Sequence, residues 1–147
     1  MPSAPRNGRA ARASSRKREV LPKTVWDSRK YKFTHGILAG DILSISGQNG
    51  INVKGEIEGK GDFERQARVS LQNMGKILAE AKMSFTDVVM LRSYFTDIGN
   101  MTRFTEIMSE FFGNYYPAAT AIEVSKLALP ELLVEVDAIA VRQRPDR

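Results

Sequence analysis

One apolar stripe constrains the fold of this chain more than any other feature of its sequence. Between residues 63 and 81, apolar residues recur at spacings of three and four, at Phe63, Ala67, Leu71, Met74, Leu78 and Ala81. This period places them on one side of an α-helix, and such a side is stable only when another layer covers it. Asp62 precedes the stripe and is suited to cap the helix. The segment therefore predicts an amphipathic helix that packs on a sheet.

Strand patterns lie on both sides of this helix. The alternation from Tyr31 to Phe33 predicts a first strand, and Ile42 to Ser46 a second, joined by a turn at residues 39–41. The nearly unbroken apolar run from Val88 to Phe95 is typical of a strand covered on both faces. A second helix is predicted from Asn100 to Gly113, and two further strands at residues 117–124 and 132–141. The order β-β-α-β-α-β-β predicts an α+β two-layer fold with both helices on one sheet face.

Composition excludes several classes of site. The 147 residues contain no cysteine, which removes disulfides, thiolate metal sites and cysteine nucleophiles. The single histidine, His35, has no second ligand or base in view, so we expect it at the surface or at an interface, and we expect no metal cluster. The glycine-rich connection from Gly47 to Gly61 is long enough to be a functional loop.

The positive charge is concentrated at the N-terminus. Residues 1–20 hold six cations and one anion, whereas residues 21–147 hold sixteen of each, so the net charge of +5 belongs to the first twenty residues. We therefore expect a basic, flexible tail at 1–20 and one domain at 21–147. Nucleic-acid binding is not expected of that domain and stays open only for the tail.

The tail itself allows three interpretations. It can be a disordered solubilising arm, a transit-type presequence, or an arm that contacts phosphates. No apolar run reaches the roughly 20 residues that cross a bilayer. We expect a cytoplasmic protein, with organellar targeting by the tail as the alternative.

A set of short motifs, in order, carries a resemblance to a known family. They are Ser46-Gly47-Gln48, Gln66-Ala67, Leu71-Gln72-Asn73, Tyr94-Phe95-Thr96-Asp97, Glu110-Phe111-Phe112, Tyr116-Pro117-Ala118 and the segment from Glu135 to Arg142. Together they resemble the YjgF/RidA/L-PSP family over about three quarters of the chain. The resemblance implies a chorismate-mutase-like fold and a homotrimer around a central barrel, with ligand clefts between subunits. In the deaminating members those clefts hydrolyse imines and enamines such as 2-aminoacrylate without metal or organic cofactor.

The implied cleft departs from the family at its most important position. An arginine in the stretch Pro-Ala-Arg-Thr grips the substrate carboxylate in the family, but this chain has Ala119 there. Phe33 replaces a pocket tyrosine, Ala121 a cysteine and Thr105 an asparagine. The remaining implied cleft residues are Ser46, Gly47, Tyr94, Thr120 through its backbone, and Glu135, which would position water.

Each of these positions also has a structural interpretation. Glu135 and Asp137 alternate with apolar residues, so both can face solvent or pair across a subunit interface. Ser46 can be a strand-end hydroxyl. Arg92, which shares strand parity with Tyr94, is a weak candidate to replace the missing cation, as is Lys126.

The resemblance, together with these residues, implies three alternative functions. The first is a trimeric binding protein for a small, less anionic metabolite, in which 2-aminoacrylate deamination is weak or absent. The second is an active metal-free enamine or imine deaminase, or related hydrolase, with a changed substrate. The third, a ribonuclease or translation inhibitor, fits poorly with the zero net charge of residues 21–147.

Overall fold

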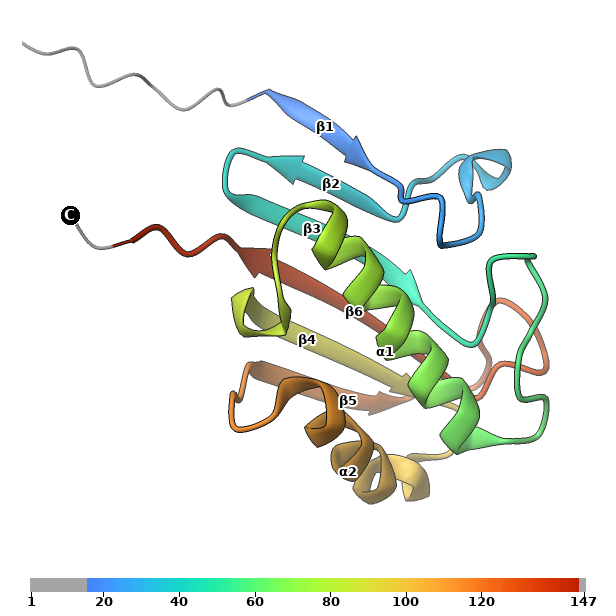
Figure 1. Cartoon of the computed structure of the whole chain (residues 1–147). Coiled ribbons are helices and arrows are strands. Elements are labelled where there is room, and N and C mark those ends of the chain that lie inside the picture. Colours follow the sequence, from blue (N-terminus) through green and yellow to red (C-terminus); the bar gives the residue numbers. More distant parts are fainter. Residues whose placement is uncertain (1–15, 146–147) are drawn as a thin grey trace, which may run out of the picture.

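The computed structural model describes residues 16–145, which form one sheet with two helices on a single face (Figure 1). The strands are β1 (Lys17–Val20), β2 (Gly36–Ala39), β3 (Ile42–Gln48), β4 (Val88–Phe95), β5 (Ala118–Glu123) and β6 (Val134–Val141). The helices are α1 (Phe63–Glu80) and α2 (Met101–Phe112), with short 3₁₀ turns η1 (Arg29–Tyr31), η2 (Phe85–Asp87) and η3 (Ile98–Asn100). The sheet order is β1-β2-β3-β6-β4-β5, antiparallel except for the β4–β5 pair. No helix among these residues is long and apolar enough to cross a membrane.

Helix α1 forms as its stripe predicts. The Asp62 carboxylate accepts a hydrogen bond from the Arg65 N–H at 3.1 Å, which caps the first turn. Leu71, Met74 and Leu78 are fully buried against the sheet. The helix ends at Glu80, and Lys82 adopts a left-handed φ of 57°, so Lys82 lies just beyond the helix.

Helix α2 also matches its predicted span and covers the other half of the same sheet face. Phe104, Ile107 and Phe112 are buried, and Gly113 ends the helix at a φ of 58°. Ion pairs bind the two helices together: Arg68 meets Glu110 at 2.8 Å and Arg103 meets Glu64 at 2.6 Å. These pairs lie at the surface, so we ascribe most of the stability to the apolar contacts.

The predicted hairpin is present, but its first strand begins later than expected. Tyr31 lies in η1, and Lys32 has a left-handed φ of 66°, so the backbone is not extended here. The strand prediction at Tyr31 to Phe33 is therefore wrong. Strand β2 starts at Gly36 and turns back at Gly40, whose φ is 61°.

The folded body begins before the predicted boundary after residue 20. Lys17–Val20 pair with β2 as an edge strand, and the Val20 side chain is fully buried in the core. One buried apolar residue among charged neighbours was too weak a pattern to identify this strand, which adds one strand to the predicted order. Residues 1–15 of the predicted tail lie outside the described part of the chain.

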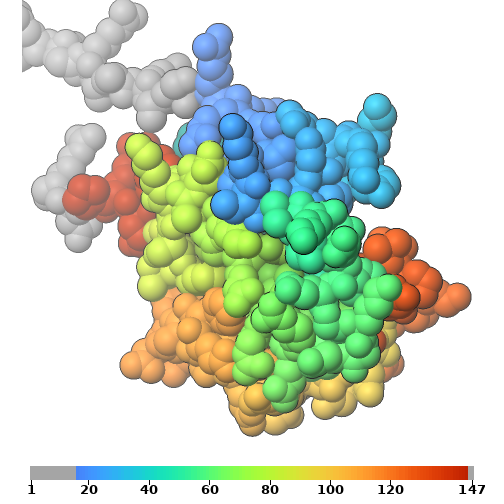
Figure 2. All heavy atoms as spheres, turned by 45° about the vertical axis from the view of Figure 1, so that its right-hand side comes forward, coloured from blue at the N-terminus to red at the C-terminus, as the bar shows by residue number. Residues whose placement is uncertain are grey.

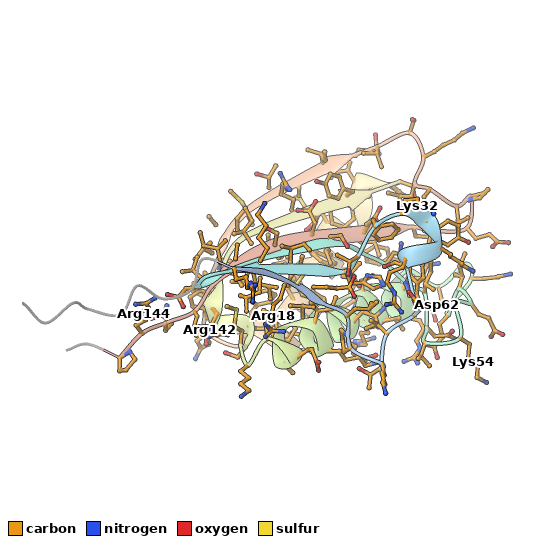
Figure 3. The ribbon with its side chains drawn as sticks, turned by 90° about the horizontal axis from the view of Figure 1, so that it is seen from above. Arg18, Lys32, Lys54, Asp62, Arg142 and Arg144 are labelled. Atoms are coloured by element: carbon orange, nitrogen blue, oxygen red, sulfur yellow. The ribbon has the colours of Figure 1, made fainter. Side chains whose placement is uncertain are left out.

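The face of the sheet opposite the helices is open in a single chain (Figure 3). In β4, Leu91 and Phe95 point into the core, while Val89 is 41% exposed and Arg92 is exposed. The expectation that both faces of β4 are covered is therefore not met within one chain. Ile37, Ile42, Ile122 and Ile139 are also exposed, and all but Ile122 belong to strands inside the sheet.

Two buried amides on α1 fix the loops at one end of the sheet. The Gln66 amide donates to the carbonyls of Gly59 (3.0 Å) and Glu131 (2.9 Å) and accepts from the Leu133 N–H (2.8 Å). The Asn73 amide donates to the carbonyls of Asn49 (3.3 Å) and Ile51 (2.9 Å). The loop from Gly47 to Gly61 is therefore held at both of its ends.

Gln66→Met tests this anchoring. It keeps the side-chain volume but leaves three loop groups without their partner, so we expect a loss of about 2–4 kcal/mol in unfolding free energy. Urea denaturation measures the loss, and amide hydrogen exchange should rise at Leu133. Gln72→Met, at an exposed position of the same helix, is the matched control. Equal stability of the two variants would contradict the anchoring role.

Candidate functional site

The candidate site lies where the connecting loops gather, at the end of the sheet that Figure 2 turns toward the viewer. The blue segment around residues 22–33, the green loop around 50–61 and the orange segment around 125–133 meet there. In Figure 3, Lys32 and Lys54 mark this end, and Arg18, Arg142 and Arg144 mark the opposite end. Most of the residues singled out by the sequence are near the loop end.

Glu135 and Gly47 are in direct contact. Glu135 lies on β6 beside β3, and its side chain crosses the backbone of Gly47. A Cβ atom on Gly47 would lie 2.7 Å from the Glu135 carboxyl carbon, closer than real Cβ contacts allow. A larger residue at position 47 would therefore displace the Glu135 carboxyl group, which occupies the space of a side chain. The structure brings together two residues that the sequence assigned to one site.

The environment of Glu135 favours its acid form. Burial raises the pKa of the Glu135 carboxyl above its ordinary value, and the nearby Asp137 carboxylate raises it further. The Asn49 side chain acts on this pKa in the opposite direction. A partly buried acid with a perturbed pKa is typical of functional sites, although structural networks produce such shifts too.

Ser46 and Gln48 join this end of β3 to the buried His35. The Gln48 amide nitrogen donates to the Ser46 carbonyl at 3.0 Å and also lies 3.0 Å from His35 Nδ1. Nδ1 must therefore accept, and His35 Nε2–H donates to the Trp26 carbonyl at 2.9 Å. His35 is fully buried, which corrects the expectation of a surface or interface position, and its burial lowers its pKa. The Ser46 hydroxyl donates to the His35 carbonyl at 3.3 Å, so it has a structural role.

Phe33 forms part of an aromatic cluster next to this network. Its ring meets those of Trp26 and His35 edge to face, at centroid distances of 5.8 Å in both cases. Phe33 is 39% exposed, so part of the ring remains available at the loop end of the sheet.

Tyr94 and Arg92 converge on Asp137. Tyr94 is opposite Glu135 in the β4–β6 register, and its hydroxyl donates to Asp137 Oδ2 at 2.7 Å. Arg92 Nε donates to Asp137 Oδ1, also at 2.7 Å. The predicted common face of Arg92 and Tyr94 is confirmed. The hydrogen bond to Asp137 raises the pKa of the Tyr94 hydroxyl.

Ala119, Thr120 and Ala121 lie apart from Glu135 in a single chain. They belong to the edge strand β5, whose six residues are all exposed, and β4 separates this strand from β6. Ala119 is in register with Leu91, which faces the helices, whereas Thr120 is in register with Arg92 on the open face. Arg92 therefore cannot replace a cation at position 119 within the same chain.

Two residues of the site, Asn49 and Asp137, were given no functional role by the sequence. Asn49 lies in the glycine-rich loop and is only 7% exposed. Asparagine is so common in loops that its presence in the sequence does not predict a functional role. Asp137 was seen only as a solvated or interfacial carboxylate. Among residues 16–145, no three His, Asp or Glu side chains gather as metal ligands.

Comparison with known proteins places the chain in a family. The profile described as Endoribonuclease L-PSP matches residues 28–142. A RutC family protein of Pyrococcus horikoshii is 38% identical over 112 residues, 76% of this chain and 87% of that protein. Human 2-iminobutanoate/2-iminopropanoate deaminase is 31% identical over 111 residues, 75% of this chain and 80% of that protein.

Solved structures agree with the sequence matches. The crystal structure of Escherichia coli TdcF with bound serine has a TM-score of 0.75 at 25% identity, and the match covers 86% of this chain and 99% of that one. The fold thus accompanies extensive sequence similarity. The chain belongs to the L-PSP family, the YjgF/RidA family that its motifs resemble.

Glu135→Gln tests the cost of burying this carboxylate. A carboxyl group whose pKa is raised in the folded state contributes its full stabilisation to the fold below about pH 4.5, its ordinary pKa. That stabilisation is lost as the pH rises through the raised pKa of the folded state. A glutamine cannot ionise, so we expect Glu135→Gln to melt higher than wild type at pH 7–8, with the advantage shrinking toward pH 4. Thermal melts across this range measure it, with the exposed Glu56→Gln as control. If the melting temperature of Glu135→Gln relative to wild type were lower at pH 8 than at pH 4, the raised pKa of Glu135 would be contradicted.

Proposed function

We propose that this chain forms a homotrimer with small-metabolite clefts between subunits, and that it hydrolyses 2-aminoacrylate-type imines weakly or not at all. One observation carries the proposal: β4 separates Gly47 and Glu135 from β5 within one chain, and β5 has Ala119 where a carboxylate-binding cation is expected. A second copy of the chain would be needed to bring these residues together.

The surface of the single chain supports assembly. Every residue of β5 is exposed, and the helix-free face carries Ile37, Ile42 and Ile139 on strands inside the sheet. Exposed apolar surface on an inner strand is unusual for a monomer and is typical of a subunit interface. The trimer is the assembly that the family resemblance implies.

The substitution at position 119 limits the chemistry. Removing a charge-assisted, two-point contact to a carboxylate commonly costs about 2–4 kcal/mol, or roughly 30- to 1000-fold. Arg92 is engaged by Asp137 on the opposite face from Ala119. A ligand less anionic than a 2-imino acid therefore suits the cleft better.

An active hydrolase with a changed substrate is the second candidate, and Glu135 favours it. In imine hydrolysis, water adds to the imine carbon, and the C–N bond of the resulting carbinolamine breaks to release ammonia and the carbonyl product. A partly buried carboxyl group with a raised pKa is suited to orient that water and to exchange its proton. The similarity to the human 2-iminobutanoate/2-iminopropanoate deaminase supports this chemistry in general, though not the substrate.

Sedimentation equilibrium tests the assembly. We expect a mass three times the 16.4 kDa of one chain, because the open sheet face needs partners to cover it. Ile139→Glu, which places a charge on that face, should shift the mass toward one chain. A wild-type protein that sediments as a monomer at micromolar concentration would refute the shared cleft.

Ala119→Arg tests the missing cation. A PLP-dependent dehydratase generates 2-aminoacrylate from serine, and pyruvate release is followed with the human deaminase as positive control. We expect wild type to stay near the rate without added protein, and Ala119→Arg to bind a 2-oxo acid roughly 10- to 100-fold more tightly. Turnover should improve further with Phe33→Tyr, and these two effects need not add.

Ala119→Leu is the matched control, because it adds volume without charge. Wild-type turnover comparable to the human enzyme would show that another group binds the carboxylate. The turnover of Arg92→Ala would then show whether Arg92 is that group.

A further inference from the structure

We propose that His35 is a positioning residue for Glu135. In its neutral form, with the proton on Nε2, the His35 ring holds Gln48, and the His35 carbonyl holds Ser46. These two residues flank Gly47, over which the Glu135 carboxyl group lies. A second proton on the ring breaks this hold. The importance of the arrangement for a ligand rests on the proposed function of Glu135, whereas the arrangement itself can be tested without any ligand.

The end of β3 contains a β-bulge around Gly47. Ile45 pairs with Ala138 on β6, and Gln48, three residues later, pairs with Val136, only two residues earlier on β6. Strand β3 therefore has one extra residue between these pairs. Ile45 faces the core, so a regular strand would turn Gln48 outward, but the extra residue turns it inward, and it is only 1% exposed. The bulge therefore requires a partner inside the protein for the Gln48 amide.

His35 provides that partner. The Gln48 Nε2 atom lies 3.0 Å from His35 Nδ1 and donates to the Ser46 carbonyl, also at 3.0 Å. The backbone carbonyl of His35 accepts from the Ser46 N–H at 2.9 Å and from the Ser46 hydroxyl at 3.3 Å. The Gln48 Oε1 atom is buried and has no hydrogen-bond partner among residues 16–145, so Nε2 alone makes the polar contacts of this side chain. His35 thus fixes β3 before and after Gly47.

The ring accepts from Gln48 only when Nδ1 carries no proton. His35 Nε2–H donates to the Trp26 carbonyl at 2.9 Å, so the proton of the neutral ring is on Nε2. A proton added to Nδ1 would face the Gln48 NH₂ group, which is also a donor. Rotation of the amide would turn Oε1 toward Nδ1, but the Ser46 carbonyl would then lose its donor. Each arrangement of the protonated ring therefore loses at least one hydrogen bond at the bulge.

The surroundings of the ring favour its neutral form. Burial is the main influence and lowers the pKa of His35, whereas the hydrogen bond to the Trp26 carbonyl and the Asp27 carboxylate act in the opposite direction. Asp27 is itself bound by Arg29, at 3.0 and 2.8 Å. The ring of Phe33 and the side chains of β3 that meet His35 carry no charge. The neutral ring therefore stabilises the fold fully above about pH 6.5, its ordinary pKa, and this stabilisation is lost as the pH falls.

The chain contains one histidine, so every imidazole signal in an NMR spectrum comes from His35. Long-range ¹H–¹⁵N spectra of the full chain between pH 8 and pH 5 report which ring nitrogen carries a proton, and amide spectra report the Gly47 N–H. Gln48→Glu is the main variant, because its carboxylate accepts from Nδ1–H and so stabilises the protonated ring. Gln72→Glu adds the same charge at an exposed position of α1 and is the matched control. Glu135→Gln removes the other titrating group next to Gly47.

We expect the wild-type ring at pH 7 to be neutral, with its proton on Nε2. In Gln48→Glu the acid dissociation constant of His35 should fall roughly tenfold or more, and in Gln72→Glu it should stay unchanged. Wherever the ring becomes protonated, the Gly47 N–H signal should shift with the same midpoint, and it should do so in the Glu135→Gln background as well. His35→Gln, which cannot be protonated, should abolish this shift in that background.

Three results would overturn the proposal. They are a proton on Nδ1 in the wild type at pH 7, an equal change of the His35 titration in Gln48→Glu and Gln72→Glu, and protonation of the ring without a shift of the Gly47 signal. A wild-type protein that sediments as a monomer, or that turns over 2-aminoacrylate like the human enzyme, would refute the proposed function and leave these results intact.

Discussion

The two helices cover only one face of the sheet, and most other features depend on this. Leu71 and Leu78 of α1 pack with Leu91 of β4 in a single apolar layer, and α2 completes that layer. The opposite face of the sheet then carries the alternate residues of each strand. On β6 these are Glu135 and Asp137, and on β4 they are Arg92 and Tyr94. These four residues thus lie on the outer side of the strands whose inner side forms the core.

Polar groups at the loop end are satisfied by side chains from distant parts of the chain. Gln66 and Asn73 are buried on α1, yet their amides bond to the loops rather than to the helix. A buried amide without partners is costly, so each amide and the loop groups it binds stabilise one another. This explains how a glycine-rich loop can hold Asn49 in a fixed position. The same loop packs against Gln66 through Gly50, where a Cβ atom would lie 2.8 Å from the glutamine side chain.

Family membership and the local chemistry lead to different expectations for activity. The family match spans residues 28–142, and one relative is named as an imine deaminase. The chain nevertheless has no cation at position 119, and the exposed Arg92 is occupied by Asp137 on the other face of the sheet. A fold shared with deaminases does not by itself supply substrate binding. The residue at position 119 therefore bears more directly on the proposed activity than the shared fold does.

The sequence alone determined the helices, the hairpin turn, the ordered family motifs and the alanine at position 119, because these depend on local period and residue identity. It could not determine β1, where one buried valine decides the pairing, or the left-handed Lys32 that interrupts the expected strand. Only the tertiary structure decided that β4 separates Ala119 from Glu135, since strand order is not encoded in any local pattern. It also decided that His35 is buried beside Gln48 and that the Glu135 carboxyl group lies over Gly47. These contacts join positions that are distant in the chain, which no local pattern encodes.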